Sequence, residues 1–134
     1  MTTILEATTI ITTQFNSNYS TTTVRWPNVA FEEPEDGTPW VSFNISIADA
    51  IIQTISVKHN DQLGMVLINV FTKARTGMIA NNTLVQEVRA IFNRLTITGI
   101  HFEAPEIRQV TTNSDDIWFN QLVRIPFVYN EALS

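Results

Sequence analysis

The segment that most constrains the fold is residues 63–72, which are apolar on both faces of an extended chain. One face carries short branched side chains and the other carries longer ones: Val66, Ile68 and Val70 against Leu63, Met65, Leu67 and Phe71. A strand with this pattern is typical of the centre of a sheet that is covered on both sides. We therefore predict a sheet with this segment as a central strand, covered on both faces.

Further strands are predicted by the alternation of apolar and polar residues. Residues 41–47 alternate strictly, which indicates a half-buried strand with one wet face, and residues 51–57 alternate likewise. Residues 117–129 predict a long last strand. Pro126 within it favours an edge position or a bulge, because proline has no backbone N–H. Shorter extended segments are expected at 97–102 and 107–110, and residues 24–31 are expected to form a kinked extended segment or a turn.

Two helices are predicted from apolar residues spaced three and four apart. The stronger pattern covers residues 78–95, where Gly77 marks the break before the helix and Asn81 or Asn82 is available as a cap. The other helix lies near the N-terminus, where an apolar stripe recurs at helical spacing: Ile4, Ala7, Ile11 and Phe15. Threonine is frequent there and has low helix propensity, so this helix requires tertiary packing.

The order of these elements predicts an α+β fold. Hairpin-like spacing between the early strands favours antiparallel pairing, and the helices are expected to cover one face of the sheet. We expect a largely antiparallel sheet of about four or five strands, with the long amphipathic helix and the N-terminal helix packed on it. Because the chain has 134 residues and no internal repeat, residues 1–134 are interpreted as a single domain.

Charge and hydropathy limit the partners of the chain. Lys and Arg number 8 against 13 Asp and Glu, so the formal charge is −5 and the pI is near 4.8. This balance argues against affinity for free nucleic acid or an anionic membrane. The N-terminus lacks the basic region of a signal peptide, and no apolar run approaches the roughly 20 residues of a membrane span. We therefore expect a protein made in the cytoplasm.

No catalytic site, metal site or cofactor is predicted. The sequence has no cysteine, which excludes thiol nucleophiles, disulfides and cysteine-ligated metal. His59 and His101 have no second ligand at metal-binding spacing, and the adjacent Asp115 and Asp116 are typical of a turn. The acidic run at 32–36 matches no calcium loop and is interpreted as a solvated loop. Four glycines and no phosphate-binding motif give no reason to expect an enzyme.

Several tryptophans lie where loops meet strands or on a mixed face of a strand. Peripheral core packing is one interpretation of this placement. The other is a subunit interface, where tryptophan and arginine are enriched. Candidates for interface contacts come from these positions and from the loops at 27–39 and 72–77. They are Trp26, Asn28, Glu32, Glu33, Trp40, Arg75, Trp118 and Arg124.

A combination of short motifs points to a known family. The run Trp26-Pro-Asn-Val-Ala-Phe31 precedes the acidic loop and the run Trp40-Val-Ser-Phe-Asn-Ile45. An apolar strand follows, Gly64-Met-Val-Leu-Ile-Asn-Val-Phe71, and Gly77 then opens the amphipathic helix. The last strand ends in Ile125-Pro-Phe-Val-Tyr129. In this order and at this length, the chain resembles the phage tail terminator (tail completion) proteins of the lambda U-like group.

The resemblance implies a structural protein of the virion, not an enzyme. Such proteins form a ring, usually a hexamer, on the head-proximal end of the tail tube. The ring ends tube polymerisation and offers a docking surface for head-completion proteins. The implied partners are further copies of this chain, the tail tube protein and a head-completion or connector protein. DNA is expected to pass through the ring without specific binding, and no membrane is expected to take part.

Two alternatives remain open from the sequence. One is another head–tail connector or tail component, because small α+β phage proteins share this length and pattern of elements. The other is a protein of a different class, a small ligand-binding module that uses a tryptophan-lined face as its pocket. An apolar cavity with convergent polar groups in the single chain would favour this last interpretation.

Overall fold

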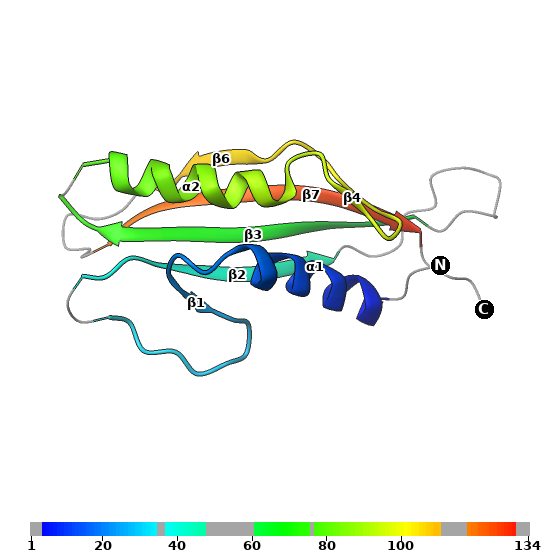
Figure 1. The fold of residues 1–134 in the computed structure, drawn as a ribbon, viewed down its shortest axis with the longest axis horizontal. Coiled ribbons are helices and arrows are strands. Elements are labelled where there is room, and N and C mark those ends of the chain that lie inside the picture. The colour runs from blue at the N-terminus through cyan, green and yellow to red at the C-terminus, as the bar shows by residue number, and fades with distance from the viewer. Residues whose placement is uncertain (1–3, 35–36, 48–60, 76, 111–117, 131–134) are drawn as a thin grey trace.

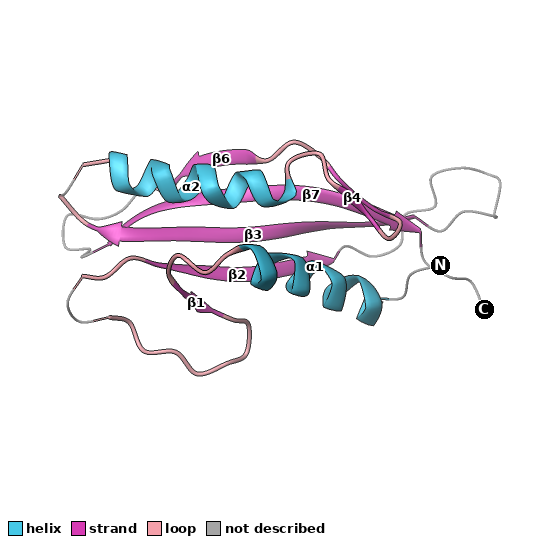
Figure 2. Ribbon diagram, in the orientation of Figure 1, coloured by secondary structure: helices cyan, strands magenta, loops and turns pink. Residues whose placement is uncertain are grey.

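The computed structural model describes residues 4–34, 37–47, 61–75, 77–110 and 118–130. Figures 1 and 2 show both helices on the same side of one sheet, in which β3 and β7 are the long strands. In chain order the elements are α1 (Ile4–Asn18), β1 (Thr23–Arg25), β2 (Trp40–Ile47), β3 (Asp61–Lys73), α2 (Ile79–Phe92), β4 (Thr96–Ile97), β5 (Ile100–Phe102), β6 (Glu106–Gln109) and β7 (Trp118–Asn130).

The sheet is mostly antiparallel, as predicted. Its strands follow the order β1-β2-β3-β7-β5-β4, and β6 pairs with β7 as well. The β1–β2 pair is parallel, whereas the other pairs are antiparallel. With seven strands among the described residues, the sheet is larger than the four or five expected. The difference arises because β1, β4, β5 and β6, which lie at or beside the expected short extended segments, also join the sheet. Each has two to four residues, too few for a periodic pattern to show that it pairs with the longer strands.

The prediction that β3 is a central strand is confirmed. It pairs with β2 on one side and with β7 along its full length on the other, from Asp61 opposite Asn130 to Lys73 opposite Trp118. The predicted strand at 51–57 lies outside the described residues.

Strand β7 is central too, so the edge position expected for Pro126 is wrong. One side of β7 pairs with β3, and the other side is shared by β6, opposite residues 121–124, and β5, opposite residues 127–129. The carbonyl oxygen of Pro126 accepts a hydrogen bond of 2.9 Å from the backbone N–H of Glu103. The backbone of Pro126 therefore points toward this shared side. Its missing N–H falls at the gap between β5 and β6.

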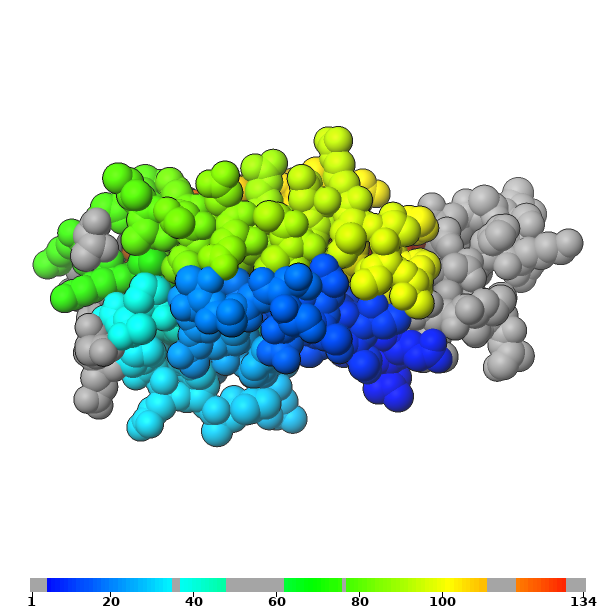
Figure 3. Space-filling model, in the orientation of Figure 1, coloured from blue at the N-terminus to red at the C-terminus, as the bar shows by residue number. Residues whose placement is uncertain are grey.

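The inner face of the sheet, which we define as the face beneath both helices, holds the hydrophobic core. In Figure 3, α1 (blue) and α2 (green) lie side by side over this face. The predicted N-terminal stripe is confirmed at Ala7, Ile11 and Phe15, which are fully buried. The other main core residues come from α2, β3 and β7: Leu84, Val85, Val88, Phe92, Val66, Ile68, Val70, Val123, Ile125 and Phe127.

The opposite, outer face of the sheet has no helix over it in the part of the chain that the structure describes. Leu63, Met65 and Leu67 of β3 are half-buried on this face. Within the described residues, the prediction that both faces of β3 are covered is therefore met on the inner face and only in part on the outer face. The apolar residues on both faces of β3 indicate that both faces are covered in the functional protein. They do not indicate whether this chain or a neighbouring chain provides the cover.

The start of α2 is fixed to the sheet by a buried amide. Asn81 is fully buried and its Nδ2 donates to the carbonyl oxygen of Val70 at 2.9 Å and to Thr72 Oγ1 at 3.1 Å. Gln121 Nε2 donates to Asn81 Oδ1 at 3.0 Å. The expected capping role of Asn81 or Asn82 is wrong, because the N-cap is Met78 and has no side-chain cap. Asn81 instead joins the first turn of the helix to β3 and β7.

A close approach between β3 and β7 requires glycine at position 64. The ring of Phe127, which lies opposite Gly64 in the register, packs directly over the glycine. A Cβ added at this position would lie 2.3 Å from Phe127 Cζ. Gly64 therefore makes room for the buried ring of Phe127 on the inner face.

Candidate interaction surface

An aromatic cluster closes one end of the outer face. The Trp40 ring stacks on Phe71 with centroids 4.0 Å apart, and Trp118 meets it edge-on at 6.0 Å. Phe31 packs on Trp40 at 4.8 Å. Within the chain Trp40 is 2% exposed and Trp118 8% exposed. Both tryptophans therefore shape this surface more than they offer area to a neighbour.

The acidic loop is attached to this cluster. Trp118 Nε1 donates a hydrogen bond of 3.3 Å to Glu33 Oε2, which holds the loop against the start of β7. Glu32 and Asn28 are exposed. Asn28 adopts a φ of 57°, and the backbone N–H of Val29 bonds to the carbonyl of Trp26 at 3.4 Å, so the chain reverses direction here. The loop thus brings Glu33, Trp40 and Trp118 together, as three of the predicted interface residues.

Trp26 lies apart from this cluster, at the periphery of the core. It is half-buried and meets the rings of Phe43 and Phe15 at centroid distances of 5.3 and 6.0 Å. Packing of this kind is the first of the two interpretations given for the tryptophans.

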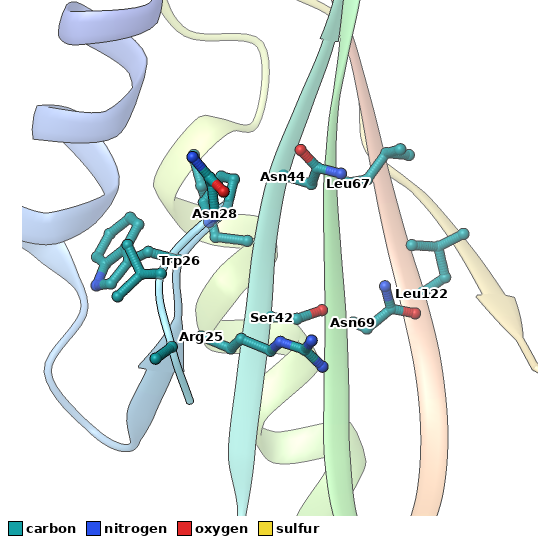
Figure 4. Close-up of a pocket in the computed structure, with 12 residues that line it drawn as sticks. Arg25, Trp26, Asn28, Ser42, Asn44, Leu67, Asn69 and Leu122 are labelled. Atoms are coloured by element: carbon teal, nitrogen blue, oxygen red, sulfur yellow. The ribbon is translucent and has the colours of Figure 1, made fainter. Parts of the chain in front are cut away.

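A shallow hollow of about 620 Å³ lies between the residues that follow β1 and the outer face. Figure 4 shows the side chain of Arg25 extending across β2 toward Ser42 and Asn69. Asn44 and Leu122 also line the hollow. Sequence patterns did not single out Arg25, because a lone arginine in a three-residue strand carries no distinctive signature.

A second, more apolar hollow of about 460 Å³ lies on the outer face, lined by Leu63, Met65 and Leu67 and bordered by Arg124. The Nε of Arg124 lies 3.3 Å from Met65 Sδ, and its Nη1 lies 3.8 Å from Glu106 Oε2. Among the predicted residues, Arg124 therefore belongs to the outer face.

Arg75 occupies a different place from the other candidates. It follows β3 in the turn that leads to α2, with a φ of 67°, and it is exposed. Two exposed apolar residues at the start of α2, Met78 and Ile79, follow it closely in the chain.

On the edge of β2 that extends past its pairing with β1, a side chain occupies one backbone hydrogen-bond donor. β1 pairs with β2 at residues 40–42, and Asn44 Oδ1 accepts a hydrogen bond of 2.9 Å from the backbone N–H of Ile45. One backbone donor at this edge is thereby occupied by a side chain of the same strand.

The described residues contain no group of three or more His, Asp or Glu side chains placed to hold a metal ion. His101 pairs with Thr96, whose Oγ1 lies 3.1 Å from its Nδ1. His59, Asp115 and Asp116 lie outside the described residues. Neither α1 nor α2, the helices that the structure describes, has the length and hydropathy to cross a membrane.

Comparison with known proteins identifies the family. A family model described as phage tail terminator protein matches residues 5–127, which is most of the chain. The chain belongs to the phage tail terminator family. This membership confirms the resemblance found in the sequence, and it places the protein among structural components of phage tails and not in an enzyme family.

A solved structure shares the fold of this tail terminator family member. It aligns with a TM-score of 0.60 over 95% of this chain and 96% of the other, at 18% sequence identity. At this identity the likeness concerns the fold alone. Among curated proteins, no sequence matches the chain.

Proposed function

We propose that residues 1–134 form a single domain that assembles into a ring, usually a hexamer in this family, on the head-proximal end of the tail tube. The ring ends tube polymerisation and provides the docking surface for head-completion proteins. The observation that carries this proposal is the family match over residues 5–127. The protein is made in the host cytoplasm and functions in the virion.

The outer face supports an assembly role. A half-buried apolar strip with two shallow hollows is typical of a surface that contacts another protein. A head-to-tail ring uses two different patches on each subunit, and the rotation between subunits decides whether it closes. One end of such a ring matches the last ring of the tube, and the other end does not recruit another tube subunit.

The predicted interface residues take different parts in this proposal. The exposed residues Asn28, Glu32 and Arg75 contact neighbouring subunits or the tube. Glu33, Trp40 and Trp118 fix the shape of the acidic loop, Trp26 supports its base, and Arg124 borders the apolar hollow. Partners are further copies of this chain, the tube protein and a head-completion or connector protein.

The experiment is electron microscopy of particles assembled without this gene product. Overlong tails, or tails detached from filled heads, are expected if the protein ends the tube. Tails of normal length that remain joined to heads would overturn the proposal. Complementation with the unaltered chain is the matched control, because it must restore tail length.

The ligand-binding alternative receives little support from the hollows. The larger hollow is open to solvent and not enclosed, although several polar side chains line it: Arg25, Asn28, Ser42, Asn44 and Asn69. A small-molecule site usually combines an enclosed cavity with several convergent polar groups. A different connector or tail component remains distinguishable by position in the particle, through labelling of the chain with an antibody or a small tag.

A further inference from the structure

The sheet ends in two short exposed strands on its opposite sides. β1 is the outermost strand beyond β2, and β6 is the outermost strand beside residues 121–124 of β7. Within the described residues no strand pairs with the far edge of either one. All four residues of β6 are exposed. Unpaired edges of this kind are templates for pairing with another chain.

The edge strands β1 and β6 lie at the same level along the strand axis of the sheet, and they run in opposite directions. Through β2 and β3, Arg25 of β1 lies level with Leu122 of β7, and β6 pairs with residues 121–124 of the same strand. β1 is parallel to β2, and β2 runs parallel to β7, whereas β6 is antiparallel to β7. If the sheet continued from one subunit into the next, β1 would therefore meet β6 in antiparallel orientation.

The side chains of the two strands are complementary face by face. In β1, Val24 points to the inner face opposite Val41, and Arg25 points to the outer face opposite Ser42. In β6, Ile107 lies on the inner face opposite Val123. Glu106 lies on the outer face opposite Arg124. Ile107 is 44% exposed, which is high for an isoleucine in a strand.

We propose that β1 of one subunit pairs antiparallel with β6 of a second copy, with Val24 opposite Ile107, Arg25 opposite Glu106 and Thr23 opposite Arg108. This register covers Ile107 with another branched apolar side chain and sets opposite charges side by side. Such cross-strand pairs stabilise a sheet. The register that keeps both strands at the same height sets Arg25 opposite Arg108, and like charges directly opposite are destabilising.

This pairing of β1 with β6, which we call the junction, rests on the proposed ring and specifies which strands of neighbouring subunits meet in it. Compared with the register that sets Arg25 opposite Arg108, the proposed register displaces each subunit by two residues along the strand direction of its neighbour's β7. A sheet that closes on itself needs such a stagger, because closure requires strands that tilt against the axis. The contact is head-to-tail, since β1 and β6 are different strands, and the blocked edge at Asn44 and Ile45 does not take part.

Cysteine cross-linking in assembled particles tests the junction, and the chain has no cysteine of its own. The variant Val24→Cys with Ile107→Cys is expected to give a disulfide ladder beyond the dimer on a non-reducing gel after mild oxidation. Four strand spacings separate β1 from β6 within one chain, about 19 Å, so the link forms only between subunits. The matched control, Arg25→Cys with Arg108→Cys, represents the level register and is expected to give no ladder.

A charge exchange provides the second test, which does not depend on cysteine. Arg25→Glu alone is expected to cause loss of normal-length tails, and adding Glu106→Arg is expected to restore them. Restoration in the double variant indicates direct pairing, because a merely local effect of Arg25 would persist. A double variant as defective as Arg25→Glu alone would overturn the junction.

The outcomes separate this inference from the proposed function. Overlong tails in the absence of the protein, together with no ladder from the Val24 and Ile107 pair in particles that contain the variant, would leave the ring in place and overturn this junction. Normal tails in the absence of the protein would overturn the proposed function whatever the cross-linking shows. A ladder from the Arg25 and Arg108 pair instead would overturn the proposed register.

Discussion

At position 64 the backbone of β3 passes beneath the ring of Phe127. Gly64→Ala is expected to lower the free energy of unfolding by about 1–3 kcal/mol, because the added methyl group has no space. Urea unfolding measures the change. The control is the same substitution in a Phe127→Leu background, where the flat ring is absent and the penalty should shrink. An equal penalty in both backgrounds would show that the ring is not its cause.

Tyr19 links stability to alkaline pH. Burial raises the pKa of its hydroxyl above the usual 10.0, with a further contribution from Glu87, while a hydrogen bond with Thr22 acts in the opposite direction. The folded state therefore holds the proton more strongly than the unfolded state. The corresponding stability is fully present below about pH 10 and is lost as the pH rises through the folded pKa.

Tyr19→Phe removes this dependence. Unfolding measured between about pH 8 and 11 should show the unaltered protein losing stability relative to the variant above about pH 10. Parallel curves for the two proteins would mean that Tyr19 does not titrate differently in the folded and unfolded states.

At the scale of elements, the docking of α2 depends on a buried polar network. Asn81→Ala leaves the buried groups of Thr72 and Gln121 without one partner each, so we expect a loss of about 1–3 kcal/mol in stability. Asn82→Ala is the matched control, because Asn82 is exposed and accepts one bond, from Gln121. Thermal unfolding of both variants checks the prediction. Equal effects at the two positions would contradict it.

The elements with long periodic patterns were predictable as helices and strands, whereas the short strands were predictable only as extended segments and not as members of the sheet. The apolar stripe on α1, the alternation in β2 and the apolar face of α2 each indicate which face of a long element packs against the core. A strand of two to four residues, such as β6, forms because β7 offers an edge nearby, which is information that its own residues do not carry. The role of Asn81 was missed for the same reason, because its partners lie on two distant strands.

At the scale of the whole molecule, the acidic loop is the feature we expect DNA to encounter. In a ring, carboxylates that face the lumen would repel the phosphates of a passing genome. Replacing Glu32, Glu33 and Glu35 with Gln and Asp36 with Asn should slow DNA ejection from the tails that form. The Glu33→Gln change keeps an oxygen acceptor for Trp118. Ejection kinetics at low and high salt provide the measurement, and unchanged ejection would show that the loop has no such role.

The candidate surface was predictable only in part. The sequence singled out Trp40, Trp118 and Glu33, which the fold does bring together, because large aromatic residues beside an acidic loop are conspicuous. It did not single out Arg25 or Ile107. Their interest comes from the positions of β1 and β6 at opposite sides of the sheet, and only the completed topology establishes that relation.

The amide of Asn44 has a consequence for the protein before assembly. A newly made chain accumulates in a crowded cell, where bare strand edges promote aggregation. By occupying the N–H of Ile45, Asn44 makes this stretch of β2 a poor template for stray strands. Asn44→Val would expose that donor and add a β-branched residue, so it should lower the concentration at which the purified protein stays clear in storage.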